Sequence, residues 1–179
     1  MSRKDISSNT RSSRVMIALR DLRADDDDFL YRVYASTRMA ELAPLGWSEA
    51  GVEAFLRMQH QAQRTDYWRN YDTSRFHVVT CDGVDAGRLY VERCTDELRI
   101  IDIAMLAEYR GRGIGSLLIS QLLAEADEAG LLLRIHVEHN NPAQHLYLRH
   151  GFVFCNEATD SIYRLMERLP RTRGASLAA

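Results

Sequence analysis

The segment Leu98–Gly130 reads LRIIDIAMLAEYRGRGIGSLLISQLLAEADEAG, and it decides the fold. Its first apolar run predicts a strand, and its last part predicts a helix with apolar residues at helical spacing that ends at Gly130. Between them, Arg110–Ser116 carries a glycine at every second position. Glycines let the backbone approach a ligand closely, and the free N–H groups of a helix start attract an anion. The segment therefore predicts a phosphate-binding turn.

The strand that enters this turn is the last of three that alternate with period two. Residues 74–81, 84–93 and 98–106 are separated by short turns, which join antiparallel neighbours. Residues 131–137 form the next strand, and a strand–helix–strand unit predicts parallel pairing by a right-handed crossover. Residues 152–169 predict a final hairpin. The expected fold is α/β (α+β), with a mixed, mostly antiparallel central sheet flanked by helices.

Two helices are expected before these strands. The first follows Asp25–Asp28, whose carboxylates complement a helix start; a metal site there would need ligands from elsewhere. The second begins after Ser48, which suits the N-cap position. One face of this second helix is predicted from its spacing: Phe55, Met58, Gln59 and Ala62. The aromatic residues of Tyr67–Tyr71 either join the core or wall a substrate site.

Composition bounds the class of protein. The chain has 179 residues, which suits one domain with a sizeable core, and its net charge of -2 gives no electrostatic case for nucleic acid. No apolar run is long enough to cross a bilayer, and three widely spaced cysteines suit a reducing compartment. We therefore expect a cytoplasmic protein without nucleic-acid or membrane partners. Residues 15–169 would form its single domain, between flexible ends at residues 1–14 and 170–179.

Other phosphate-binding turns fit the sequence less well. A dinucleotide-binding turn has the spacing Gly-x-Gly-x-x-Gly and follows a strand of an alternating parallel series, whereas this turn reads Gly-x-Gly-x-Gly after an antiparallel meander. A Walker-type loop requires Gly-Lys-Ser/Thr, which is absent here. Both kinds of nucleotide site are therefore disfavoured.

Two motifs resemble those of the GNAT superfamily, the acyl-coenzyme A dependent N-acetyltransferases. The pyrophosphate-loop signature Gln/Arg-x-x-Gly-x-Gly/Ala is met by Arg110, Gly113 and Gly115. A second motif, Asn-x-x-Ala-x-x-Leu-Tyr-x-x-x-Gly-Phe, is met by Asn140, Ala143, Leu146, Tyr147, Gly151 and Phe152. Asn140 fits the motif count, whereas Asn141 fits a helix cap ahead of Pro142. Ala107 departs from the family, which often has proline there.

The resemblance implies a splayed parallel strand pair and acetyl-CoA as acyl donor, with no metal. Backbone N–H groups of the glycine turn would bind the pyrophosphate, and backbone groups of the preceding strand would pair with the pantetheine arm. Tyr147 would give a proton to the departing thiolate. The cofactor-binding residues it implies are Ile103, Ala104, Met105, Arg110, Gly111, Arg112, Gly113, Ile114, Gly115, Ser116 and Asn140. A catalytically silent coenzyme A binding or sensing module is the alternative.

A primary amine would attack the thioester directly, and a base would take its proton. Asp102 lies in the middle of an apolar strand, and a carboxylate there must be paired or face an opening. His136 and Glu138 share one face of the next strand by alternation. We name Asp102 and Glu138 as candidate bases beside Tyr147, although each could be a structural polar group.

The acceptor side is expected in the N-terminal half, in the loop Glu41–Trp47 and the aromatic residues of Tyr67–Tyr71. Glu41, Glu49 and Asp66 could attract a cationic amine. The sequence leaves open whether the acceptor is a small molecule or the amine of a peptide or protein. It also leaves open whether the final strands pair with a second copy in a homodimer.

Overall fold

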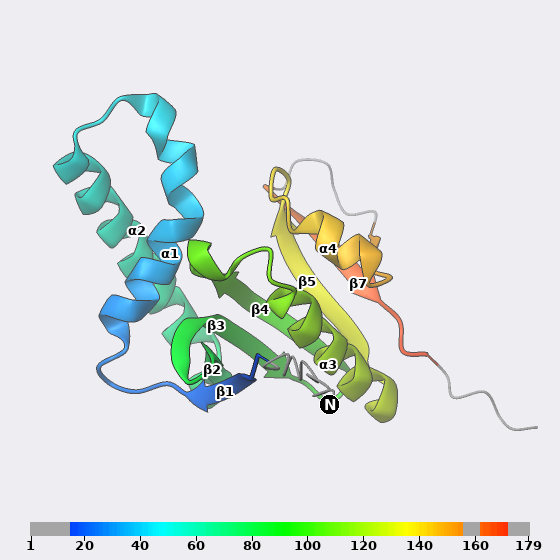
Figure 1. Cartoon of the computed structure of the whole chain (residues 1–179). Coiled ribbons are helices and arrows are strands. Elements are labelled where there is room, and N and C mark those ends of the chain that lie inside the picture. The colour runs from blue at the N-terminus through cyan, green and yellow to red at the C-terminus, as the bar shows by residue number, and fades with distance from the viewer. Residues whose placement is uncertain (1–14, 156–161, 172–179) are drawn as a thin grey trace, which may run out of the picture.

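A computed structural model describes residues 15–155 and 162–171, which form a sheet with strand order β1-β2-β3-β4-β5-β7-β6 (Figure 1). The ends predicted to be flexible, residues 1–14 and 170–179, lie outside the described residues except for Pro170 and Arg171. The strands are β1 Ile17–Asp21, β2 Phe76–Cys81, β3 Val84–Arg93, β4 Glu97–Met105, β5 Leu132–Glu138, β6 Val153–Phe154 and β7 Tyr163–Arg168. Within the described residues only β4 and β5 pair in parallel, so the predicted mixed, mostly antiparallel sheet is confirmed.

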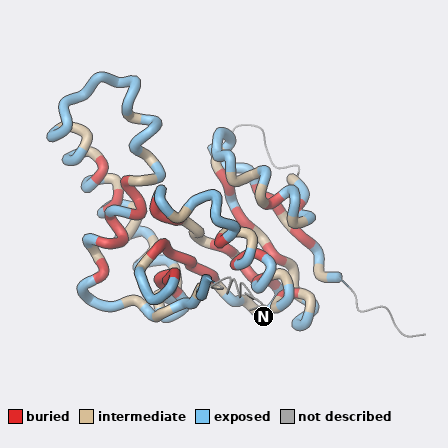
Figure 2. The backbone as a smooth tube through the Cα atoms, in the orientation of Figure 1, coloured by how far each residue is buried: buried red, intermediate tan, exposed pale blue. Residues whose placement is uncertain are grey.

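Helices cover both faces of the sheet. The long helices α1 (Asp27–Leu42) and α2 (Glu49–Asn70) lie on one face, and α3 (Ile114–Ala129) and α4 (Gln144–Arg149) on the other. Three short 3-10 turns connect elements: η1 Ala43–Leu45, η2 Thr73–Arg75 and η3 Ala107–Tyr109. Both faces of β2 are buried, and Val78 packs towards α1 while Val79 packs towards α3. Figure 2 shows the buried segments on the strands and on the helix faces turned towards them. None of the described helices is long and apolar enough to span a membrane.

The parallel pair splays at the end that faces the glycine turn. Pairing between β4 and β5 runs from Glu97–Leu132 to Ile100–Ile135 and then stops, although both strands continue. The end of β4 stays with β3 instead, and Gly87 permits this, since a Cβ there would lie 2.4 Å from the Ala104 carbonyl oxygen. We call the region between residues 101–105 of β4 and 136–138 of β5 the splay.

The N-terminal helices differ from the prediction in which side chains they bury. Ser48 caps α2 as expected and accepts a hydrogen bond from the Gly51 amide. The buried residues of α2 are Leu56 and His60, however, while Met58 is 58% exposed, so the predicted inward face was wrong. The reason is that α2 packs against α1 through the rings of Tyr31 and Tyr34 around His60.

Contacts with other parts of the chain decide the roles of the Tyr67–Tyr71 aromatic residues, of the acidic run before α1 and of the turn before α4. Tyr67 and Tyr71 pack against Phe76 in the core under α1 and α2. Asp26 of the acidic run occupies the N-cap position of α1, but its carboxylate binds Arg20 instead of the helix start. The helix predicted from Pro142 starts two residues later, and the Asn141 side chain accepts a hydrogen bond from the Ala143 amide in a turn ahead of it.

Candidate active site

The glycine turn ends in an open helix start. Gly111 and Gly113 have φ of 72° and 79°, in the left-handed region that favours glycine. The first helical bond of α3 joins the Leu117 amide to the Gly113 carbonyl, so the N–H groups of residues 114–116 have no partner within the helix. No side chain caps this helix, and a Cβ on either left-handed glycine would meet nothing within 4 Å among the described residues. The turn is therefore shaped to receive an anion.

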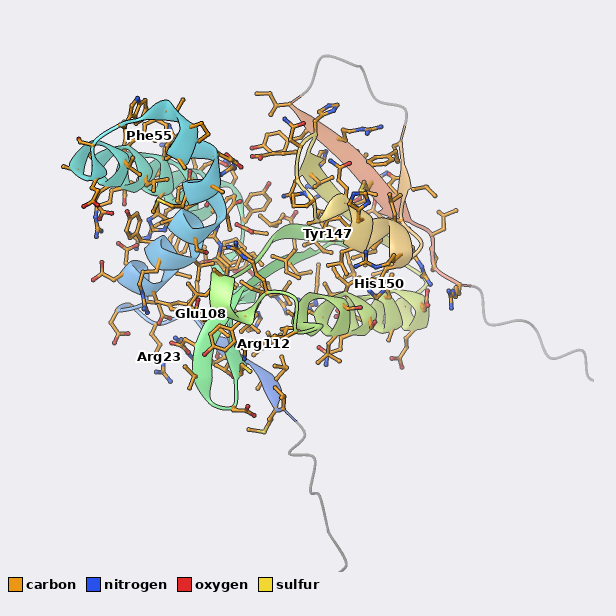
Figure 3. All side chains as sticks on the ribbon, turned by 45° about the horizontal axis from the view of Figure 1, so that its top comes forward. Arg23, Phe55, Glu108, Arg112, Tyr147 and His150 are labelled. Atoms are coloured by element: carbon orange, nitrogen blue, oxygen red, sulfur yellow. The ribbon has the colours of Figure 1, made fainter. Side chains whose placement is uncertain are left out.

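The start of α3 is fixed against α4. A Cβ on Gly115 would lie 3.3 Å from Leu146, so glycine allows the two helices to approach closely. The Ser116 hydroxyl lies 2.7 Å from Nε2 of His150. Figure 3 shows Arg112 on the turn ahead of α3, Tyr147 on α4 and His150 directly after the end of α4. The two sequence motifs are thus in direct contact.

The two arginines of the turn have different surroundings. Arg110 donates from Nε to the Met105 carbonyl (2.9 Å) and from Nη2 to the Ser36 hydroxyl (2.7 Å), so it braces the turn against β4 and α1. Arg112 is exposed, with its guanidinium 5.3 Å from the Tyr109 ring centroid. The Leu106 amide donates to the Ala86 carbonyl of β3, so by alternation the backbone groups of Ala104 also face β3 and those of Ile103 face the splay. Since the Met105 carbonyl is already bonded to Arg110, Ile103 is the better backbone candidate for the pantetheine arm.

Tyr147 is a residue of α4 and belongs to the core between the sheet and helices α3 and α4. Its side chain is 3% exposed and contacts Phe152 edge-on. Burial raises the pKa of the Tyr147 hydroxyl, and the negative charge of Asp102 raises it further. Its hydroxyl has no hydrogen-bond partner among the described residues. Tyr147 therefore remains protonated at neutral pH and available as a proton donor.

Asp102 lies on the opposite face of the sheet, opposite Tyr90 in the strand register. Its Oδ2 accepts hydrogen bonds from Nη2 of Arg88 (2.5 Å) and from the Tyr67 hydroxyl (3.4 Å). Arg88 is 4% exposed and also donates to Gln63 (3.0 Å). Sequence reasoning missed Arg88, although a charge at the centre of this strand, between Gly87 and Leu89, was a signal. The described residues leave Oδ1 of Asp102 without a hydrogen bond.

Glu138, the last residue of β5, is bound to Arg38 of α1 by two hydrogen bonds. The Arg38 guanidinium holds the pKa of Glu138 below its usual range, which makes this carboxylate a weak base. Arg38 was also missed from the sequence. His136 is exposed on the same face of β5, as alternation predicted.

Of the remaining candidates, Glu41 lies beside Arg38, whereas Asp66 binds Asn70 and Glu49 lines a separate surface pocket. Asn140 is exposed, and the described residues offer its side chain no hydrogen bond. No cluster of side chains in the described ranges could hold a metal ion.

The sequence profile of the acetyltransferase (GNAT) family matches residues 37–152. The chain belongs to the GNAT family. It is therefore an acetyl-CoA dependent N-acetyltransferase, as the two motifs predicted. The matched range contains the glycine turn and ends at Phe152, the last residue of the second motif.

Similar proteins support this placement. A Bacillus subtilis (strain 168) protein that carries the name of a ribosomal protein bS18-alanine N-acetyltransferase is 29% identical over 137 residues, which cover 75% of this chain and 79% of that protein. The PaiA N-acetyltransferase of Thermoplasma acidophilum, solved in complex with coenzyme A, has a TM-score of 0.63 at 20% identity and covers 86% of this chain and 99% of its own. The ribosomal-protein-S18-alanine N-acetyltransferase of Escherichia coli has a TM-score of 0.59 at 19% identity, with coverage of 92% and 100%. These two structures share the GNAT fold with this chain.

Proposed function

We propose that this N-acetyltransferase acetylates the N-terminal amine of a polypeptide. The observation that carries the acceptor class is the match to the Bacillus subtilis relative, which is named for the alanine of ribosomal protein bS18 and aligns over three quarters of this chain. The α1/α2 face supports the same class: Glu41 and Glu138 share the single guanidinium of Arg38, and the remaining negative charge suits the approach of a cationic chain end.

The donor would lie across the glycine turn. The N–H groups of residues 111–116 would bind the pyrophosphate of acetyl-CoA, assisted by the dipole of α3 and by the exposed charge of Arg112. Backbone groups of Ile103 would pair with the pantetheine arm within the splay, where β4 has left β5. We assign Arg110 to bracing the turn, and Asn140 to the ligand, because its side chain makes no hydrogen bond within the described residues.

The reaction would use both faces of the sheet. The amine nitrogen attacks the thioester carbonyl carbon, and the carbon–sulfur bond breaks as the acetyl group moves to nitrogen. Tyr147, from the α3/α4 face, gives its proton to the departing coenzyme A thiolate. The proton lost by the amine goes to a base on the α1/α2 face. We assign that role to Asp102, acting directly or through water with its unbonded Oδ1, in preference to Glu138, which is committed to Arg38.

The test is a thiol-release assay with acetyl-CoA over peptides of varied N-terminal residue and over small amines, with the acetylated position read by mass spectrometry. We expect transfer to a peptide N-terminus with a higher kcat/KM than to any small amine. Coenzyme A binding without thiol release on any acceptor would instead indicate a sensing module. Transfer to small amines alone would overturn the polypeptide assignment.

The base is tested through kcat on the best acceptor, at a pH where the acceptor amine is neutral. Asp102→Asn should lower kcat about a hundredfold or more, whereas His136→Gln, on the same face of the sheet, should leave kcat nearly unchanged. If His136→Gln lowers kcat and Asp102→Asn does not, the two roles are exchanged.

A further inference from the structure

The ion pair between Arg38 and Glu138 crosses from α1 to the end of β5, on the acceptor side of the splay. Nη1 of Arg38 donates to Oε2 of Glu138 at 2.8 Å, and Nη2 donates to Oε1. The Tyr163 hydroxyl lies 3.5 Å from the same Oε1. A bidentate guanidinium–carboxylate contact is specific as well as strong, so this carboxylate is shaped to hold a planar cation.

Both partners are anchored on elements that border the donor site. The backbone carbonyl of Glu138 accepts a hydrogen bond from the Gln144 side chain (2.7 Å), which ties it to the start of α4. Two residues before Arg38, the Ser36 hydroxyl accepts a hydrogen bond from Arg110 of the glycine turn. The helix α1 is therefore bonded to both sides of the splay, and Arg38 is its link to β5.

The local charge favours a second cation. Nη1 of Arg38 also donates to Glu41 on its own helix, at 3.2 Å, so two carboxylates share one guanidinium. Arg38 and Glu138 are only partly buried, with side chains 28% and 24% exposed. Arg38 can thus keep Glu41 as a partner while it gives up Glu138, and Glu138 would then be open to a cation from outside.

We propose that Arg38 occupies, in the free enzyme, the place of a cationic side chain of the acceptor, and that the acceptor displaces it from Glu138. The selected acceptor would carry an arginine or lysine close to its reacting N-terminus. This cation is distinct from the reacting amine, which must be neutral to attack. The proposal rests on the proposed polypeptide acceptor and makes Glu138 a specificity-determining residue.

The test compares two acceptor peptides that differ only in an arginine or a norleucine, placed in turn at positions 2, 3 and 4. In Glu138→Gln, the KM of the best arginine peptide should rise by about tenfold, the value of one charge-assisted hydrogen bond, while that of the norleucine peptide stays constant. In Arg38→Met, the KM of the arginine peptide should instead fall, because the internal competitor is gone. A merely structural ion pair would make both variants change in the same direction.

Arg93→Met is the matched control. It removes another partly exposed, bidentate pair, in which Arg93 donates to Glu125 at 2.6 and 3.0 Å away from the splay, and it should change neither KM. Parallel changes of KM in Arg38→Met and Glu138→Gln, or no preference for the arginine peptide in the wild type, would overturn the exchange. If the wild type acetylates no peptide, the polypeptide assignment fails by itself. A diamine and a monoamine of equal length then replace the peptides. The KM of the diamine should again rise in Glu138→Gln and fall in Arg38→Met.

Discussion

Gly113 and Gly83 offer a matched pair for testing the anion site of the glycine turn. Gly113 has φ of 79° at the start of α3, and Gly83 has φ of 80° in the turn between β2 and β3. A Cβ at either position would meet nothing within 4 Å among the described residues. Alanine should therefore impose the same backbone strain at both sites, about 1–2 kcal/mol. For a chain of this size that corresponds to a fall in Tm of roughly 2–8 °C.

Only Gly113→Ala should weaken coenzyme A binding. Its methyl group would project into the open space before the residue 114–116 amides, where we place the pyrophosphate, and relief of the strain would turn those amides away. We expect the Kd for coenzyme A to rise at least about tenfold, or 1.4 kcal/mol. At a coenzyme A concentration about 100 times the wild-type Kd, binding stabilises the wild type and Gly83→Ala by about 2.7 kcal/mol, and Gly113→Ala by only about 1.4 kcal/mol.

Thermal unfolding with and without coenzyme A, together with calorimetric titration, measures both quantities on the same samples. Without ligand the two variants should have equal Tm. With coenzyme A, the Tm of Gly83→Ala should rise as much as that of the wild type, and the Tm of Gly113→Ala should rise less. An equal gain in Tm for both variants, with equal Kd, would refute the assignment of the turn as the anion site. A Gly113→Glu variant adds negative charge at the same place and should abolish binding altogether.

Three further predictions concern groups near the splay. Tyr147→Phe should lower kcat about a hundredfold or more without changing the Kd for coenzyme A, because it removes only the proton donor; an unchanged kcat would exclude Tyr147 from the chemistry. Arg88→Met should lower the free energy of unfolding by about 3–5 kcal/mol in urea, because Asp102 is left charged and unpaired, and adding Asp102→Leu should restore most of it; no recovery would show that the pair itself is not the cause. Burial lowers the pKa of His60 in the folded chain, so at mildly acidic pH the unfolded chain binds a proton at this residue and the folded chain does not. The free energy of unfolding should therefore fall as the pH drops below about 6.5. His60→Phe should flatten this dependence, and an unaltered slope would assign it to other groups.

The sequence predicted the strand, glycine turn and helix of Leu98–Gly130 well because this segment is built from local signals. The glycines of Arg110–Ser116 specify positive φ and a helix start within seven residues, and the order of strands around them follows from short turns and one crossover. The α2 start at Ser48 was equally local. The inward face of α2 was not, because Leu56 and His60 are buried by contact with α1 and not by the helix's own apolar pattern.

The acceptor side shows why residue roles are harder to predict than residue positions. Alternation on β5 placed Glu138 on the correct face, and a lone carboxylate beside the expected amine is reasonably interpreted as a base. Its partner Arg38 is 100 residues away in sequence, and no local pattern links the two. The guanidinium lowers the pKa of that carboxylate and occupies both of its oxygens, so the same position becomes a binding group for a cation. Asp102 is paired as well, with Arg88, but through one oxygen only, and this difference is why we propose Asp102 and not Glu138 as the proton acceptor.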